Sequence, residues 1–452
     1  MNPCLPPCHL AVGLAIGVLL AVPTVTPATT LLIRDATVHT VSGPVLNSAS
    51  VLVRDGRIAA VGDLGQPAAE EIVDGRGLHV YPGLVALTTT LGLTEVEAVR
   101  ATRDTTEVGA FRPDVFAWVA VNPDSELIPV ARANGITHAQ TVPLGGILSG
   151  HSAVLQLAGW TVEELAFRRL GALHVFWPSF DLDHTPKEKA PAPDRWKSVE
   201  DQERDRDQRL AALDSLFAEA EAYQAARGNH PPPVLPGTAT QRPAAGAIPA
   251  WEAMVPVIRG ECPVFLHADG IREIRSALAW AARRKLRAVL AGGRDAWRIA
   301  EELAAQKVPV AYEHVFTLPP REQDGYDVQF RAPAVLAQAG VPVSFASGLD
   351  RFAASNVRHL PYEAAQAVAF GLSADEAVRG LTLNPARALG LDDRLGSLEP
   401  GKDATFFLCS GDLLDLRARV LRLWIEGRET SLESRHTRLY ERYRQRPVPA
   451  SP

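Results

Sequence analysis

The chain has 452 residues, of which 46% are hydrophobic and 22% charged, so it can bury a large core and is not a disordered chain. Lys and Arg number 46 against 52 Asp and Glu, and this net charge of -6 gives no electrostatic reason to expect nucleic acid as a partner. Four cysteines without CxxC spacing exclude a disulfide scaffold and leave open whether Cys262 and Cys409 pair.

The N-terminal segment has the pattern of a signal peptide. Residues 10–22 form a continuous apolar run, and Thr26, Pro27 and Ala28 follow with small residues where a secretory cleavage site requires them. The first nine residues contain no Lys or Arg, so the alternative is a buried strand or helix of the folded domain. We expect residues 1–28 to be removed on export, which leaves a periplasmic or secreted protein without stable membrane insertion.

The two ends of the chain carry similar strand-rich blocks. In residues 29–81 short apolar and polar runs alternate, and Asp55-Gly56 falls between two apolar runs, which is a good hairpin signal. Residues 391–430 repeat this pattern, and Glu426-Gly427-Arg428 resembles Asp55-Gly56-Arg57. The pattern predicts one small β-sandwich domain that is built from both chain ends.

The long middle part, residues 82–390, alternates apolar strand-like runs with helical runs. Because no glycine-rich nucleotide loop is present, this alternation favours an α/β fold of the TIM-like (β/α)8 barrel type over a doubly wound sheet. A charged and Pro-rich insertion at about 181–236 is expected to be a solvated excursion on the barrel rim. The basic tail, 431–452, is expected to form a short surface helix and a loose end.

Three framework motifs occur in a characteristic order. They are Tyr81-Pro82-Gly83-Leu84-Val85, then Leu381-Thr382-Leu383-Asn384-Pro385-Ala386, then the run from Gly396 to Ala404. In this order and spacing they resemble the amidohydrolase superfamily, in particular its imidazolonepropionase-like, prolidase-like branch. The resemblance implies a TIM-like barrel beside a composite β-sandwich. It also implies metal-assisted hydrolysis of C–N bonds in amides and related small molecules, at the carboxyl ends of the barrel strands.

The sequence departs from the metal-ligand pattern that this resemblance implies. Thr88-Thr89-Thr90 replaces the His-x-His expected after the first barrel strand, and a Thr hydroxyl is a poor zinc ligand. Gly292-Gly293 stands at the sixth-strand position for His, and Gly348 at the eighth-strand position for Asp. No Lys lies between Lys197 and Lys285, so a carboxylated fourth-strand Lys has no candidate. The ordinary two-metal centre is therefore not encoded.

A reduced site can still be assembled around the fifth-strand histidine, His267. His267, His314 and Asp350 all fall at or beyond predicted strand ends, and three such ligands with water suit one divalent ion, zinc by preference. The alternative is no metal at all, with His267 as a hydrogen-bonded structural residue. Glu313 and His314 are adjacent, so only one of them can point into the barrel.

Further candidate residues lie in a glycine-rich segment, residues 143–152, which we interpret as a loop. His151 is a candidate acid or base, and a tight packing turn is the more ordinary interpretation. The predicted catalytic and substrate-contacting residues are as follows: His267, Asp269, Asp350 and His151 for catalysis, and Thr88, Thr90, Gly146 and Ser149 for substrate.

Three functional hypotheses remain open. The first is an exported amidohydrolase-like hydrolase of a small amide or dipeptide-like molecule with a single-metal site. The second is a catalytically inactive barrel that binds a small ligand through its loops. The third is metal-free hydrolysis by His267 or His151 with Asp269 or Asp350. The sequence does not decide between a monomer and a homo-oligomer.

Overall fold

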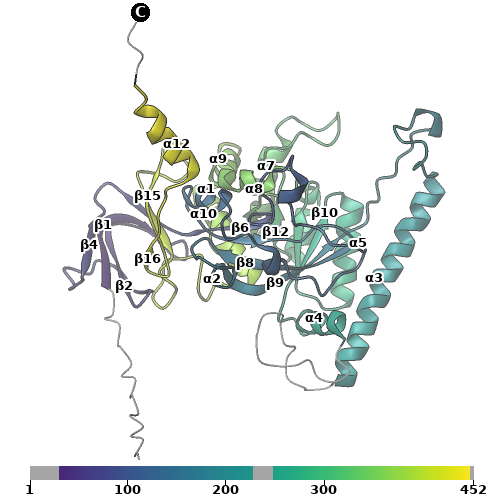
Figure 1. The fold of residues 1–452 in the computed structure, drawn as a ribbon, viewed down its shortest axis with the longest axis horizontal. Coiled ribbons are helices and arrows are strands. Elements are labelled where there is room, and N and C mark those ends of the chain that lie inside the picture. The colour runs from purple at the N-terminus through teal and green to yellow at the C-terminus, as the bar shows by residue number, and fades with distance from the viewer. Residues whose placement is uncertain (1–29, 228–247, 448–452) are drawn as a thin grey trace, which may run out of the picture.

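The computed structural model describes residues 30–227 and 248–447, which form a sheet domain and a helix-covered barrel (Figure 1). The predicted signal segment lies outside the described residues. The strands are β1 Thr30–His39, β2 Val45–Arg54, β3 Arg57–Gly62, β4 Glu71–Asp74, β5 His79–Pro82, β6 Leu84–Thr89, β7 Ile136–Thr141, β8 Leu148–Gln156, β9 Ala166–Phe176, β10 Val264–Ala268, β11 Ala288–Gly292, β12 Val310–Tyr312, β13 Val343–Phe345, β14 Phe406–Cys409, β15 Val420–Ile425 and β16 Arg428–Glu429. The α-helices are α1 Leu127–Arg132, α2 Val162–Leu165, α3 Val199–Arg227, α4 Pro249–Ile258, α5 Ile271–Arg283, α6 Ala300–Ala305, α7 Val328–Gln338, α8 Ala353–Asn356, α9 Leu360–Ala369, α10 Ala374–Leu381, α11 Leu383–Leu389 and α12 Arg435–Arg444.

The sheet domain is built from both chain ends. Its strand order is β16-β15-β14-β5-β1-β2-β3, with β4 paired to β1, so the C-terminal strand β14 lies against the N-terminal strand β5. The two Gly-containing turns that flank it pack together, because a Cβ atom on Gly56 would stand 2.7 Å from the carbonyl oxygen of Glu426. The composite sheet domain expected from the sequence is therefore confirmed.

The second sheet closes into a barrel with the strand order β13-β12-β11-β10-β9-β8-β7-β6. A parallel bridge between Leu87 and Ala346 joins its first and last strands. The TIM-like barrel is confirmed, with one departure: β8 runs antiparallel to both β7 and β9. The connection from β7 to β8 is too short for a crossover helix, so these strands form a hairpin.

The second half of segment 143–152, from Leu148 on, is therefore strand, and the interpretation as a loop was wrong for that half. Only the connection before Leu148 is irregular, and Gly146 lies in it with a φ of 72°. Ser149, His151 and Ser152 are buried within β8. The Gly-Ser-His composition is typical of a loop, but pairing with a strand on each side overrides that local preference.

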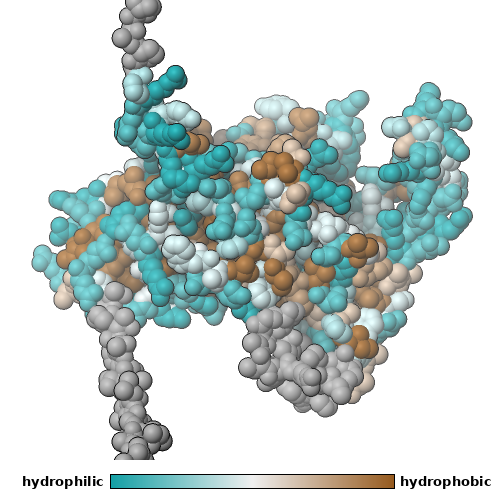
Figure 2. All heavy atoms as spheres, in the orientation of Figure 1, coloured by the Kyte–Doolittle hydropathy of each residue, from teal (hydrophilic) through white to brown (hydrophobic). Residues whose placement is uncertain are grey.

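The charged insertion contains the long helix α3, which stands at the edge of the barrel (Figure 1). The side chains of Leu213 and Phe217 are buried, and the Phe217 ring meets Trp280 of α5 edge-on at 4.8 Å. Its remaining surface is largely hydrophilic (Figure 2). One face of the helix is thus solvated on the rim, as expected, and the apolar face with Leu213 and Phe217 packs on the barrel.

Two further observations bear on the expectations from composition. In the part of the chain that the structure describes, no helix combines the length and the apolar character needed to cross a bilayer. Cys262 and Cys409 are both buried and both free thiols, so they do not pair with each other.

Candidate active site at the barrel mouth

Strand alternation decides which side chains enter the barrel. Phe265 and Ala311 belong to the apolar cluster that fills the barrel interior, on β10 and β12 respectively. Since every second residue of a strand points the same way, His267 and Glu313 face the interior two residues further toward the carboxyl ends. These ends form the mouth, where barrel enzymes keep their reacting groups. Of the adjacent pair, it is therefore Glu313 and not His314 that points inward.

Glu313 is a carboxyl group in a strongly perturbed environment at the inner mouth. Its Oε1 atom is buried and makes no hydrogen bond to a described residue. Burial raises the pKa of Glu313 to about 7, Thr88 and His314 oppose the rise, and Asp269 and Asp350 add to it. A carboxyl group that titrates near neutrality can both accept and return a proton.

Gly348 leaves the space beside Glu313 open. A Cβ atom on Gly348 would stand 3.4 Å from Glu313 Oε2, and the glycine has a φ of 75°. This is the position for which the family resemblance implies a metal-binding Asp. In this chain the carboxylate at the mouth thus comes from β12 instead of from the eighth strand.

Glu363 on α9 is a second buried acid, and the sequence reasoning missed it. Burial and then the charges of Glu313 and Asp350 raise the pKa of Glu363 to about 8. The only sequence signal is an acidic residue on the inner face of an amphipathic helix, which is also compatible with an ordinary helix start.

His314 and Asp269 form a pair on the rim. His314 Nε2 donates to Asp269 Oδ1 at 2.7 Å, and the backbone N–H of Arg294 donates to the same oxygen at 3.2 Å. Burial acts to raise the pKa of Asp269, but the bonds from His314 and Arg294 outweigh it and hold that pKa below its usual value. Gly292 permits this approach, because a Cβ atom there would stand 2.7 Å from Asp269 Oδ1.

His267 is held by a second histidine. Its Nε2 atom lies 2.9 Å from Nδ1 of His174 on β9, and its ring stacks on Phe176 with centroids 4.2 Å apart. Burial lowers the pKa of His267 to about 3, with Asp269 opposing the shift. The ring is therefore neutral at neutral pH. His174 sits in a predicted strand, but nothing in the sequence marked it as a partner of His267.

Thr88 has an unusual backbone conformation at the end of β6. Its φ is 42°, which is uncommon for a β-branched residue, and its N–H donates to Gln140 Oε1 at 3.2 Å. Strained backbone of this kind is often found at functional sites. Thr90 is also buried, and its carbonyl accepts a hydrogen bond from the N–H of Leu93.

Of the remaining predicted catalytic residues, Asp350 acts on this group through its charge and His151 lies apart from it. Asp350 is exposed, and its carboxylate accepts the N–H of Phe352 at 2.9 Å in the turn after β13. His151 alternates with Ser152, whose Oγ bonds to Gln140 inside the barrel, so His151 faces the outer layer and stacks on Phe116. Burial lowers the pKa of His151 to about 4. Its place in the outer layer takes His151 away from the barrel interior.

The predicted metal set is not brought together. Within residues 30–227 and 248–447, no three or more His, Cys, Asp or Glu side chains are grouped so that they could hold a metal ion. The residue types explain this absence. Thr88 and Gly348 stand where the resemblance implies metal ligands, and the Nε2 atom of His267 is hydrogen-bonded to His174. The residues present do not fit the implied metal centre.

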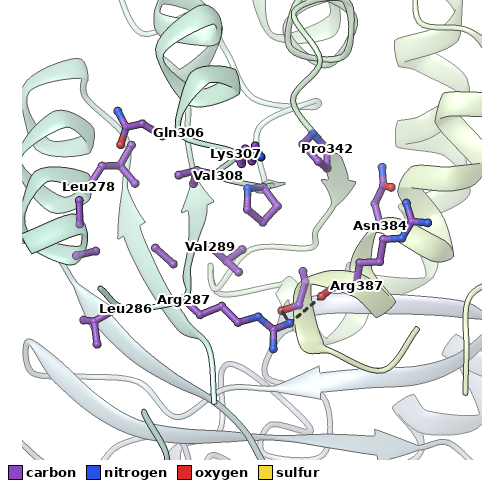
Figure 3. Close-up of a pocket in the computed structure, with 15 residues that line it drawn as sticks. Leu278, Leu286, Arg287, Val289, Gln306, Lys307, Val308, Pro342, Asn384 and Arg387 are labelled. Atoms are coloured by element: carbon purple, nitrogen blue, oxygen red, sulfur yellow. Dashed lines mark hydrogen bonds between the residues drawn. The ribbon is translucent and has the colours of Figure 1, made fainter. Parts of the chain in front are cut away.

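A cavity of about 590 Å³ lies at the opposite end of the barrel (Figure 3). Its lining residues include those at the amino ends of β11, β12 and β13. Barrel enzymes keep their catalytic groups at the other end of the strands. Arg287, which reaches across it in Figure 3, donates to the carbonyl oxygens of Arg387 and Ala388 at the end of α11. Arg287 thus caps the C-terminus of α11, and we interpret its role in this cavity as structural.

Comparisons with known proteins agree with this architecture. Residues 264–430 match the model of the amidohydrolase family. A 5-methylthioadenosine/S-adenosylhomocysteine deaminase from Teredinibacter turnerae is 33% identical over 120 residues, which cover 21% of this chain and 27% of that protein. An imidazolonepropionase from Shewanella baltica is 40% identical over 74 residues, 16% of this chain and 18% of that protein. The chain thus matches only about a quarter or less of these curated relatives' length.

The structural likeness covers far more of the chain. The crystal structure of an amidohydrolase from Thermotoga maritima superposes with a TM-score of 0.73 at 26% identity. The superposition covers 89% of this chain and 99% of that one. The family match at the C-terminal half of the barrel and this likeness over nearly the whole fold lead to one conclusion. Residues 264–430 are of the amidohydrolase family, and the fold over nearly the whole chain is that of a solved amidohydrolase.

Proposed function

We propose that this chain hydrolyses a C–N bond of a small molecule at the barrel mouth, with Glu313 as the group that transfers the proton. The observation that carries the proposal is the inward Glu313 side chain, which has a buried, unpartnered Oε1 atom and a pKa of about 7. The family match supports the reaction class, because the matched relatives include a deaminase and an imidazolonepropionase.

The chemistry needs one group that first accepts and then returns a proton. As a carboxylate, Glu313 takes a proton from a water molecule, whose oxygen bonds to the carbon of the scissile C–N bond. The Glu313 carboxyl group then gives the proton to the nitrogen, which leaves as an amine or ammonia. A pKa near the ambient pH serves both steps. We assign no step to a metal ion, because the described side chains do not fit one.

The test is a turnover assay on a panel of dipeptides, N-acyl amino acids, cyclic amides and aminopurines. Release of carboxylate, amine or ammonia is measured for the wild type, for Glu313→Gln and for the exposed control Glu188→Gln. Glu313→Gln should lose turnover by about 100-fold or more, the usual contribution of an acid–base group, and the control should not. Full activity in Glu313→Gln contradicts the proposal.

A second candidate is a ligand-binding barrel without catalysis. The specific observation in its favour is the substitution of implied metal ligands by Thr88-Thr89-Thr90 and Gly348. This candidate predicts that a member of the same panel raises the melting temperature of the protein but is recovered unchanged. Product release by the wild type eliminates it.

We also propose export, with the small-molecule substrate met outside the cytoplasm. The apolar run at residues 10–22 and the small residues that follow it support this proposal. N-terminal sequencing of the protein recovered from its natural compartment should begin after residue 28. An intact Met1 contradicts export.

A further inference from the structure

A chain of side-chain hydrogen bonds crosses the barrel from β6 to β10 and ends at His267. The backbone N–H of Thr88 donates to Gln140 Oε1 at 3.2 Å. Gln140 Nε2 lies 3.3 Å from His174 Nε2, and His174 Nδ1 lies 2.9 Å from His267 Nε2. All four residues come from neighbouring parts of the inner wall, on β6, β7, β9 and β10.

The donor and acceptor of each hydrogen bond in this series follow from the first bond. A backbone N–H can only donate, so the Gln140 atom that faces Thr88 is the carbonyl oxygen and the other terminal atom is the NH2 group. This NH2 group donates one hydrogen bond to Ser152 Oγ, at 3.1 Å, and one to His174 Nε2. Because an amide NH2 cannot accept, Nε2 of His174 must carry the lone pair.

The same argument then assigns the tautomers of both histidines. A neutral imidazole has one N–H, so His174 carries its proton on Nδ1 and donates it to His267 Nε2. His267 must in turn carry its proton on Nδ1. Burial lowers the pKa of His174 well below its usual value and that of His267 to about 3, so both rings are neutral. A cationic His174 would place two N–H donors against each other at Gln140.

The outer nitrogen of His267 is free for a ligand. Its Nδ1 atom makes no hydrogen bond to a described residue, and the His267 side chain is partly exposed at the mouth. Stacking on Phe176, with ring planes 9° apart, fixes the plane in which the Nδ1–H bond lies. The Nε2 lone pair is already used by His174, which removes His267 from the roles of metal ligand through Nε2 and of general base.

We propose that His267 is a fixed hydrogen-bond donor, which presents Nδ1–H to the carbonyl oxygen of the substrate, and that Gln140 and His174 are the positioning residues that set its tautomer. The proposal rests on the hydrolytic function proposed above. When the water oxygen bonds to the carbonyl carbon, the π electron pair moves to the carbonyl oxygen. The Nδ1–H bond stabilises that charge until the C–N bond breaks and the oxygen becomes a carbonyl again.

The tautomer can be observed directly in the full chain. Long-range ¹H–¹⁵N spectra of histidine-labelled protein at neutral pH, with His267→Gln and His174→Gln for assignment, should show both rings neutral and protonated on Nδ1. Gln140→Glu replaces the NH2 donor by a carboxylate acceptor, so His174 should move its proton to Nε2 and His267 should follow. Gln306→Glu, at an exposed position, is the matched control and should change neither ring.

A buried carboxylate is costly, so Gln140→Met provides a second variant that removes the donor without adding charge. It should leave His267 as a mixture of both tautomers. A wild-type His267 ring with its proton on Nε2, or a cationic ring at neutral pH, overturns the proposal whatever the variants do.

Steady-state kinetics of His267 variants test the contact between His267 and the substrate. With a panel compound that is turned over, His267→Phe keeps the ring stack but lacks the donor, and it should lower kcat by about 100-fold with a smaller change in KM. His267→Gln restores an N–H donor and should recover part of kcat. Unchanged kcat in His267→Phe overturns the donor role. The NMR result needs no turnover, so its failure is distinguishable from the failure of Glu313 as the proton-transfer group.

Discussion

Nε2 of His314 lies 2.7 Å from Oδ1 of Asp269, and this pair bridges the carboxyl ends of β10 and β12 across Gly292. Because the interaction holds the pKa of Asp269 below its usual value, its stabilising effect is present above the pKa of an unfolded Asp. It is lost as the pH falls through the folded-state value.

Asp269→Asn should therefore destabilise the chain at neutral pH by about 1 kcal/mol, a charged hydrogen bond reduced by solvent screening. Urea unfolding at about pH 7 and about pH 3 checks this, since the difference from the wild type should shrink at the lower pH. Exposed Asp194→Asn is the control and should match the wild type at both values. An equal loss at both pH values would show that the carboxylate charge has no role.

The pKa of Glu313 predicts the opposite pH dependence. It is raised from 4.5 to about 7, so folding holds a proton that the unfolded chain has released. The resulting stability is full below about 4.5 and is lost as the pH rises through about 7. Glu313→Gln cannot ionise, and at about pH 8 it should be more stable than the wild type by about 2 kcal/mol. Thermal unfolding in a pH series tests this, with no gain expected for Glu188→Gln.

Gly146 tests the close packing of the connection that precedes β8. A Cβ atom there would stand 2.6 Å from the carbonyl oxygen of Ala110, at a φ of 72°. Gly146→Ala should cost about 2–3 kcal/mol. Gly340→Ala is the matched control, because that glycine has a φ of 87° with no atom within 4 Å of the added Cβ, and it should cost only about 1 kcal/mol. Equal costs in urea unfolding would contradict the close packing.

Metal content tests the donor set. Since Thr88 and Gly348 stand in place of ligands and His267 Nε2 is bonded to His174, protein purified without added metal should contain far less than one zinc per chain. Added zinc should not raise its melting temperature, and His267→Ala should not change its metal content. Stoichiometric zinc that disappears in His267→Ala would restore the single-metal hypothesis.

Much of the fold could be predicted because its signals are local. The turns at Gly56 and Gly427 occur in hairpins whose sequences resemble each other, and they pack together as the composite domain requires. β8 could not be predicted, because its glycine and hydroxyl residues are typical of loops and only its pairing with β7 and β9 makes it a strand.

The candidate site could likewise be predicted only in part. Alternation predicts that only one of Glu313 and His314 enters the barrel, but which one depends on the register of β12 against its neighbours. The link from Gln140 to His267 joins residues more than a hundred positions apart through His174, so no short motif encodes it. Glu363 reaches the site from a helix, and its pKa is raised first by its burial and then by the charges of Glu313 and Asp350.

The carboxyl pKa at the mouth is the quantity on which the proposed hydrolysis depends most directly. A ¹³C NMR titration of glutamate-labelled protein measures it, with Glu313→Gln and Glu363→Gln to assign the resonances. One resonance that titrates at about 7 and is missing in Glu313→Gln is the predicted result. If the resonance lost in Glu313→Gln instead titrates near the ordinary value of 4.5, Glu313 is a solvated surface acid and the proposed mechanism is wrong.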